Sequence, residues 1–344
     1  MVSMNKIFSS VFSSVLLLGV FLIMQGCGDS KAPAEKEIIH TVTGPIGIEE
    51  LGFTLTHEHA MSNFGLDISE AHQYDETELF SQVIPYLKKV KSLGVDTIFD
   101  CTSPYFGRRV DLLQQMADLT GLQIITNTGI YGAADNRYVP EYAFEASAVE
   151  LASMWTKEFD EGIDGTDIKP GFVKLAFNEG TPSEIEKKLF EAGVLTHLQT
   201  GLTLAVHTGN NPEAVETQLR ILEEHGVSPE AWVWVHAHWD ADIDLLIETA
   251  LKGAWISLDG ANEGNIEEFL EYLERFRSEN LLHRVLLSHD GDAYPAGGEI
   301  RPFDAIPKYL IPAMRERGFT DSEIDQIMIE NPKKAFMPRI RRSE

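Results

Sequence analysis

The stretch Phe53-Thr54-Leu55-Thr56-His57-Glu58-His59 is an apolar, β-rich run that ends in two histidines. Similar runs recur along the chain, separated by segments in which apolar residues return about every 3.6 positions, as in amphipathic helices. The further runs span residues 97–100, 123–129, 171–174, 203–207, 232–238, 255–259 and 284–290. The clearest helical segments span residues 77–93, 108–120, 182–200 and 240–252, and Pro182 and Pro212 suit first helical turns. Strands that alternate with helices in this way predict a parallel sheet in an α/β protein.

Two architectures fit such a sheet: an open, doubly wound sheet and a closed (β/α)₈ barrel. No Gly-x-Gly-x-x-Gly turn follows any of the strands, which argues against the commonest dinucleotide-binding sheet. Several strands finish with a His, Lys or Asp, and barrel closure would gather those ends at one mouth. We therefore predict a single-domain TIM barrel over residues 39–344.

The composition narrows the range of partners. The chain has 344 residues, of which 43% are hydrophobic and 24% charged, and its formal net charge is -26. The acidic residues are spread along the chain, so a polyanion would be repelled and nucleic-acid binding is not expected. A small-molecule substrate is the expected partner.

The N-terminal residues differ from the rest. Lys6 precedes an apolar segment over residues 7–24, and Gln25-Gly26-Cys27 is followed by a polar segment. This order resembles a bacterial lipoprotein signal: residues 1–26 would be the signal peptide, Cys27 the lipidated first residue and residues 27–38 a tether. An uncleaved anchor helix is the alternative. Both interpretations predict an exported protein of the cell envelope, and the first anchors it to a membrane by lipid. The second cysteine, Cys101, reads as a small buried side chain.

His57 and His59 are two positions apart in an extended run, so their side chains share one face. Neutral imidazole is a good ligand for Zn, and also for Fe, Ni or Co. Two histidines hydrogen-bonded to backbone would give the same pattern. The pair alone therefore leaves metal binding open.

Other strand ends strengthen the metal hypothesis. His207 ends one apolar strand, His236 and His238 end another, and Asp290 ends the last. A carboxylate at that position can bind metal and also accept a proton from bound water. A single strand-end histidine would more often be a core residue, but four such strands together argue against coincidence.

Lys174 follows Gly171-Phe172-Val173 in a strand whose inner face would be buried. A buried ammonium is costly unless it is paired or neutralised. One interpretation is that Lys174 pairs with Asp290 or extends to the mouth. The other is a neutral lysine that reacts with CO₂, and the resulting carbamate would bridge two metal ions.

Several motifs resemble the phosphotriesterase family of the amidohydrolase superfamily, which includes the phosphotriesterase-like lactonases. The similarity runs over residues 41–337. The motifs are Thr43-Gly44-Pro45-Ile46, Gly52 to His59, Thr128-Gly129-Ile130-Tyr131, Ser288-His289-Asp290 and Asn331-Pro332-Lys333-Lys334.

This resemblance implies a site for two divalent ions, preferably Zn, with Co, Mn, Ni or Fe as alternatives. His57, His59 and Asp290 would hold the buried ion, and His207 and His238 the more exposed one. Carbamylated Lys174 and a hydroxide would bridge both ions. His236 competes for the sixth-strand position, but the acidic stretch after His238 favours His238.

The resemblance also implies a reaction. The bridging hydroxide would attack an ester, lactone, amide or phosphotriester centre, while Asp290 takes up the proton. Tyr131 would line the pocket, as in the lactonases. An Arg after the seventh strand is typical of lactonases, but this chain has Asp259-Gly260-Ala261-Asn262 there, and the segment after Asp290 is short. Related barrels commonly dimerise, so a homodimer is among the assemblies that the resemblance allows.

Two other functions remain at this level. One is a surface binding lipoprotein on a catalytically decayed barrel, although none of the expected ligand positions is missing. The other is a single-metal amidohydrolase or deaminase, and such enzymes generally lack the bridging lysine.

Overall fold

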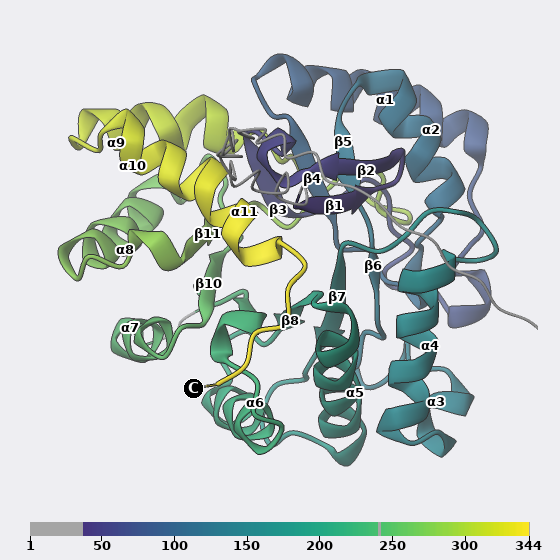
Figure 1. Ribbon diagram of the computed structural model, residues 1–344. Coiled ribbons are helices and arrows are strands. Elements are labelled where there is room, and N and C mark those ends of the chain that lie inside the picture. The colour runs from purple at the N-terminus through teal and green to yellow at the C-terminus, as the bar shows by residue number, and fades with distance from the viewer. Residues whose placement is uncertain (1–36, 240–241, 344) are drawn as a thin grey trace, which may run out of the picture. The chain divides into compact units, whose positions relative to one another are not determined.

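The computed structural model describes residues 37–239 and 242–343, and its central feature is a ring of parallel strands (Figure 1). Two hydrogen-bonded arcs make up the ring, in the orders β11-β10-β9-β8-β7-β6 and β12-β3-β4-β5. β5 and β6 are consecutive pieces of one strand position, separated by Thr126, and β11 and β12 are pieces of another. The arcs therefore join at both ends, and the predicted TIM-barrel-like fold is confirmed. The strands are β3 (Thr54–His59), β4 (Thr97–Asp100), β5 (Gln123–Ile125), β6 (Asn127–Thr128), β7 (Phe172–Ala176), β8 (Thr203–His207), β9 (Trp232–Val235), β10 (Trp255–Leu258), β11 (Val285–Leu287) and β12 (Gly291–Asp292).

Helices pack around the outside of this ring (Figure 1). They are α1 (Glu76–Ser92), α2 (Val110–Thr120), α3 (Glu141–Glu145), α4 (Ala148–Glu161), α5 (Glu184–Thr200), α6 (Pro212–Glu224), α7 (Ile243–Leu251), α8 (Ile266–Ser278), α9 (Ile311–Glu316), α10 (Asp321–Asp325) and α11 (Asn331–Phe336). Pro212 is the first residue of α6, as predicted. Pro182 lies outside its helix, because Ser183 caps α5 and forms a capping box with Glu186.

Three strands are shorter than the sequence pattern predicts. β9 ends at Val235 instead of residue 238, β10 at Leu258 instead of 259, and β11 at Leu287 instead of 290. His236 and Asp290 have positive φ angles of 59° and 52°, which no strand can accommodate. The strands stop where their side chains begin to line the mouth.

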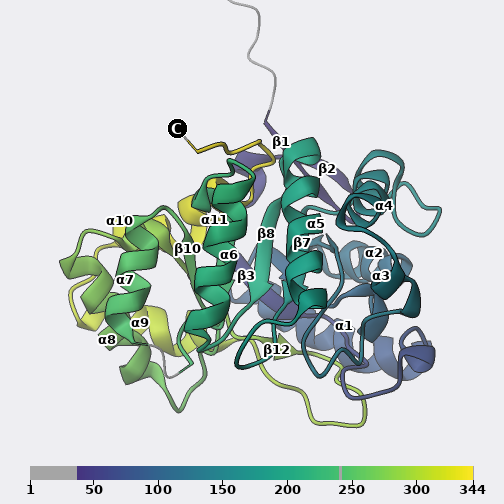
Figure 2. The same ribbon diagram turned by 90° about the horizontal axis from the view of Figure 1, so that it is seen from below.

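The opposite end of the barrel is closed by apolar side chains. The hairpin of β1 (Ile38–Thr41) and β2 (Gly44–Gly47) lies at this end, and β12 lies at the other (Figure 2). Ile39 from the hairpin packs in one buried cluster with Phe99, Phe172 and Phe336. We call this cluster the floor of the barrel. It separates the mouth from the end at which the described chain begins.

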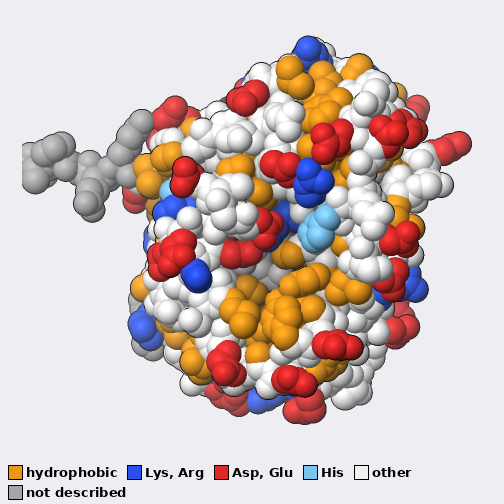
Figure 3. Space-filling model, turned by 90° about the vertical axis from the view of Figure 1, so that its right-hand side faces the viewer, with side chains coloured by type: hydrophobic (Ala, Val, Ile, Leu, Met, Phe, Trp, Pro, Cys, Tyr) orange, Lys and Arg blue, Asp and Glu red, His pale blue; other side chains and the backbone are white. Residues whose placement is uncertain are grey.

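Several predictions concern residues that the structure does not describe. The signal peptide over residues 1–26, lipidated Cys27 and most of the tether lie outside the described residues. Within the described ranges, no helix is long and apolar enough to cross a membrane. Cys101 is buried and free, as predicted, and burial raises the pKa of its thiol. Acidic side chains are scattered over the face shown in Figure 3, as their spread along the sequence predicts.

Candidate metal centre

A cavity of about 160 Å³ lies at the mouth of the barrel. Its wall combines ring nitrogens, a carboxylate, an ammonium and aromatic rings. The lining residues are His57, His59, Ser62, Phe64, Phe106, Tyr131, Lys174, His207, His236, Trp239, Asp290 and Arg301. The histidines, Lys174 and Asp290 lie on barrel strands or just after their C-terminal ends, where TIM barrels place their active sites.

The two histidines of β3 point into this cavity together with Asp290. The pairing of β3 with β4 shifts register between Leu55 and Glu58, a bulge of the kind found beside active sites. The Nε2 atoms of His57 and His59 lie 3.3 and 3.2 Å from the same Asp290 oxygen. Ligand atoms of these three residues lie within 4.8 Å of one another. They could therefore hold one metal ion.

Lys174 lies beside this group, deep in the barrel. Its side chain is 1% exposed, and its Nζ is 3.3 Å from His57 Nε2. Burial and the charge of Lys174 lower the pKa of His57 to about 3, so this imidazole is neutral. Gly129 explains part of the placement, because a Cβ there would lie 2.4 Å from the Lys174 carbonyl oxygen. A larger residue at position 129 would push β7 away.

His207 ends β8, and the ring of His236 lies against it, with centroids 4.5 Å apart. Burial, and next the charge of His236, hold the pKa of His207 well below its usual value. The indole of Trp239 stacks on His236 at 4.2 Å and covers its outer face. The rings of His207 and His236 thus line the cavity from the fifth and sixth strand positions.

The sixth-strand position is occupied by His236, whereas we had expected His238. The prediction assumed that β9 continues to residue 238, which would put both rings on one face. The positive φ of His236 ends the strand and turns its ring inward. His238 does not line the cavity, and its Nε2 lies against Gly260, 2.1 Å from where a Cβ would be. His236 is therefore the sixth-strand residue that the structure brings to the other ligands.

The four cavity histidines share one arrangement: each Nδ1 has a partner in the protein. Asp259 lies 2.7 Å from His57 Nδ1 and 2.9 Å from His236 Nδ1. The Thr102 hydroxyl lies 2.8 Å from His59 Nδ1, and the Tyr131 hydroxyl lies 3.1 Å from His207 Nδ1. Thr102 donates its own proton to the Met61 carbonyl, so it accepts from His59. Partners of this kind fix the tautomer that presents Nε2 to a metal.

Asp290 is held in its left-handed backbone conformation by Glu58. The buried Glu58 carboxylate accepts hydrogen bonds from the amides of His289 and Gly291, on both sides of Asp290, at 3.1 and 2.8 Å. It also accepts from the Ser288 hydroxyl at 2.8 Å and from His289 Nδ1 at 2.6 Å. Burial opposes ionisation of Asp290, but the neighbouring histidines, His57 first, outweigh it and lower the pKa of Asp290. Asp290 is thus an ionised carboxylate aimed at the cavity.

The remaining wall is largely aromatic. Phe64, Phe106, Tyr131 and Tyr138 pack edge to face or tilted at the third-strand side of the mouth, with Tyr131 at the cavity itself. Arg301 contributes a guanidinium to the wall and donates from Nε to the Asp290 carbonyl at 3.3 Å. The guanidinium groups of Arg108, Arg109 and Arg137 donate elsewhere, to Glu158, to Asp111 and to the Gly65 carbonyl. The cavity can therefore hold a small substrate with an apolar part.

The donor set fits divalent metal ions. Imidazole nitrogens and a carboxylate are ligands that Zn, Co, Ni and Fe accept. The Nδ1 atoms of the four histidines already have partners in the protein, so their Nε2 atoms are the ones available to a metal. The sequence did not reveal Asp259, Glu58 and Thr102 as functional residues. The position of Asp259 at the end of a strand was a usable signal, because the other strand ends supply the ligands.

The chain is similar to known proteins over most of its length. The model of the phosphotriesterase family matches residues 37–336. A phosphotriesterase homology protein of Escherichia coli K12 is 28% identical over 300 residues, which cover 85% of this chain and 100% of that protein. An aryldialkylphosphatase of Saccharolobus solfataricus is 29% identical, over 84% of this chain and 96% of that protein. An N-acetyltaurine hydrolase of Danio rerio is 26% identical, over 86% of this chain and 97% of that protein. A mutant of an organophosphorus hydrolase from Deinococcus radiodurans superposes with a TM-score of 0.78 at 26% identity, covering 87% of this chain and 97% of its own.

Proposed function

The chain belongs to the phosphotriesterase family, and we propose that it is a hydrolase with a two-metal centre at the barrel mouth. The observation that carries the proposal is the convergence of metal-binding side chains from five strand positions on one cavity. They are His57, His59, Lys174, His207, His236 and Asp290.

His57, His59 and Asp290 would hold one ion, and His207 and His236 the other. We assign His236 in place of His238 because its ring lies 4.9 Å from that of His57 and 4.5 Å from that of His207. Lys174 lines the same cavity, and its Nζ contacts Nε2 of His57. That placement supports a CO₂-derived carbamate on Lys174 as the bridge, with Zn as the preferred metal.

When bound, two divalent ions would activate a water molecule and neutralise negative charge that develops on the substrate. Asp290 would accept the proton, since its carboxylate is ionised and its side chain is 30% exposed toward the mouth. The Glu58 carboxylate would keep Asp290 aimed at the cavity during this transfer. The aromatic wall would take up the apolar part of the substrate and exclude water.

The proposed substrate is a small ester, lactone, amide or phosphotriester. The cavity volume of about 160 Å³ admits a short acyl or alkyl group rather than a polymer. A wider hollow that shares Phe64, Tyr131, His207 and Trp239 has room for a larger leaving group. The names of the relatives include a phosphatase for aryl dialkyl esters and a hydrolase of N-acetyltaurine, so both bond types belong in the test.

The test is purification, metal analysis and a panel of lactones, aryl esters, N-acyl amino acids, N-acetyltaurine and paraoxon-like triesters. We expect about two ions per chain, turnover of at least one panel member and loss of activity on chelation. A fully active metal-free enzyme would contradict the metal proposal. Failure to turn over any panel member would contradict the substrate class.

We also propose that the protein is exported and anchored through lipid on Cys27. The support is the order of charge, apolar segment and Gly26-Cys27 in the sequence. Globomycin, which blocks lipoprotein signal cleavage, should leave a precursor of higher mass in the expressing bacterium. An unchanged mass would contradict the anchor. Light scattering of the purified protein would test for a homodimer, one of the assemblies that the resemblance allows.

A further inference from the structure

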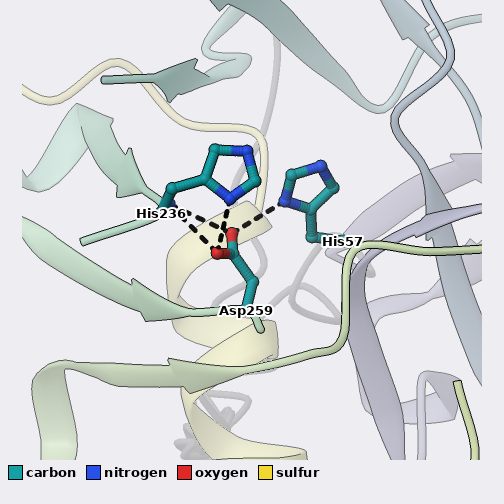
Figure 4. A group of neighbouring side chains, drawn as sticks. All are labelled: His57, His236 and Asp259. Atoms are coloured by element: carbon teal, nitrogen blue, oxygen red, sulfur yellow. Dashed lines mark hydrogen bonds and ion pairs between the residues drawn. The ribbon is translucent and has the colours of Figure 1, made fainter. Parts of the chain in front are cut away.

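Asp259 follows β10 and contacts one histidine from each half of the proposed centre (Figure 4). Its Oδ2 lies 2.7 Å from Nδ1 of His57, and its Oδ1 lies 2.9 Å from Nδ1 of His236. Its side chain is 0% exposed. A single buried carboxylate thus contacts rings from the first and sixth strand positions.

The other contacts of Asp259 show whether its carboxylate donates or accepts in the hydrogen bonds to the two imidazoles. Oδ1 accepts the backbone amide of His236 at 3.1 Å, and Oδ2 accepts the hydroxyl of Ser257 at 3.0 Å. Four groups are thus placed to donate to the two oxygens of Asp259: Nδ1 of His57, the backbone amide and Nδ1 of His236, and the Ser257 hydroxyl. An ionised carboxylate can only accept hydrogen bonds, so both imidazoles must donate from Nδ1.

We propose that Asp259 is a positioning residue that fixes the tautomer of one histidine at each of the two metal positions. With Nδ1 protonated, His57 and His236 both present an unprotonated Nε2 to the cavity. This inference rests on the proposed two-metal function and adds a residue that links the two positions without binding either ion.

The proposal predicts an asymmetric effect of the isosteric change Asp259→Asn. An amide has one accepting oxygen and one donating nitrogen, so it cannot serve both rings as a carboxylate does. The fixed backbone N–H of His236 lies 3.1 Å from Oδ1 and 3.3 Å from Oδ2, so the shorter contact favours the amide oxygen at the Oδ1 position. The amide nitrogen then occupies the Oδ2 position and donates to His57. The Ser257 hydroxyl is compatible with an amide nitrogen at this position, because a hydroxyl can also accept a hydrogen bond. His57 would carry its proton on Nε2, where it cannot bind metal.

The experiment measures metal stoichiometry by native mass spectrometry across a zinc titration. Wild-type protein should bind two ions, whereas Asp259→Asn should retain one and bind the other about 10- to 100-fold more weakly. Adding His207→Asn to Asp259→Asn should remove the retained ion, and adding His59→Asn should leave it. The matched control Ser257→Ala removes a donor to Asp259 but keeps the carboxylate, so it should still bind two ions.

Two ions bound to Asp259→Asn as tightly as to wild type would overturn the inference while leaving the proposed function intact. Wild-type protein that binds no metal would contradict the proposed function instead. If Asp259→Asn does not fold, long-range ¹H–¹⁵N NMR on metal-free wild-type protein would show directly which ring nitrogen of each histidine carries the proton. We expect Nδ1-protonated rings for both histidines, assigned through His57→Gln and His236→Gln. An Nε2-protonated ring at either position would overturn the inference.

Discussion

The two ends of the barrel interior are built from opposite kinds of side chain. At the floor, Phe336 packs on Phe99 with ring centroids 4.2 Å apart and on Phe172 at 5.9 Å. At the mouth, the equally buried His57 and Lys174 need hydrogen-bonding partners, and Asp290 has a left-handed backbone. Burial of apolar area stabilises the floor, whereas buried polar groups and positive φ angles lower the stability of the mouth. The same barrel therefore separates the residues that hold it folded from those that would react.

The largest expected effect is at the mouth. Asp290→Asn removes the proposed proton acceptor but keeps an oxygen ligand, so turnover of an active panel substrate should fall about 10²- to 10⁴-fold. Metal content should stay near that of the wild type. The measurements are kcat and metal analysis, with surface residue Asp244→Asn as a control that should change neither. Unchanged turnover would remove Asp290 from the mechanism.

The floor should respond in stability instead. Phe336→Ala removes a buried ring, so the free energy of unfolding should fall by about 3–5 kcal/mol. The metal content of the protein that remains folded should not change. Denaturant unfolding measures the free energy of unfolding, and metal analysis measures the metal content. The matched control is Phe144→Ala, since Phe144 is 50% exposed and its loss should cost under about 0.5 kcal/mol. Equal losses for both variants would contradict the role of the floor.

A third prediction concerns pH at the floor end, where the C-terminus also lies (Figure 2). Buried His197 donates to the Leu202 carbonyl and accepts the Arg341 amide, and burial lowers its pKa to about 4. The unfolded chain then binds more protons than the native protein between pH 6.5 and 4. Stability contributed by His197 is present above pH 6.5 and is lost as the pH falls, by at most about 1.4 kcal/mol per pH unit.

Unfolding of wild type and His197→Gln at several pH values would isolate this contribution. The difference between the two proteins should shrink as the pH falls from 6.5 toward 4. Parallel pH profiles would show that His197 does not titrate differently on folding.

The smallest effect is expected at the edge of the mouth. Tyr131→Phe removes the hydroxyl that contacts His207 Nδ1 but keeps the aromatic wall. Loss of one such hydrogen bond is worth about 1 kcal/mol, which is about fivefold in affinity for the second ion. Zinc titration would measure it. Tyr142→Phe is the control, because the Tyr142 hydroxyl contacts Tyr105 away from the cavity. A hundredfold loss would show that Tyr131 is itself part of the centre.

The barrel and most of its site could be predicted because they depend on local patterns. The alternation of strands and helices predicted the ring, and histidines at strand ends predicted the cavity. The choice between His236 and His238 could not be predicted in this way. Both residues fit a strand of period two, and only the three-dimensional structure shows that the strand ends at Val235.

The roles of residues whose partners are distant in sequence could not be predicted from the sequence either. Asp259 was noted only as a departure from the lactonase pattern, since its role depends on rings 202 and 23 residues away. Glu58 sits between two predicted ligands, and an alternating strand suggested no role for it. Its partners are more than 200 residues away, a distance over which a local pattern carries no information.

The Glu58 contact also has a consequence for the order of folding. Glu58 and Gly291 are separated by 233 residues, and they join the first barrel strand to the last. Asp290 reaches its partners only when that seam closes, after nearly the whole chain has left the ribosome. Pairings this distant in sequence form slowly. A nascent chain therefore carries its histidines for most of its synthesis without a complete site, and the site is complete only once this seam has closed.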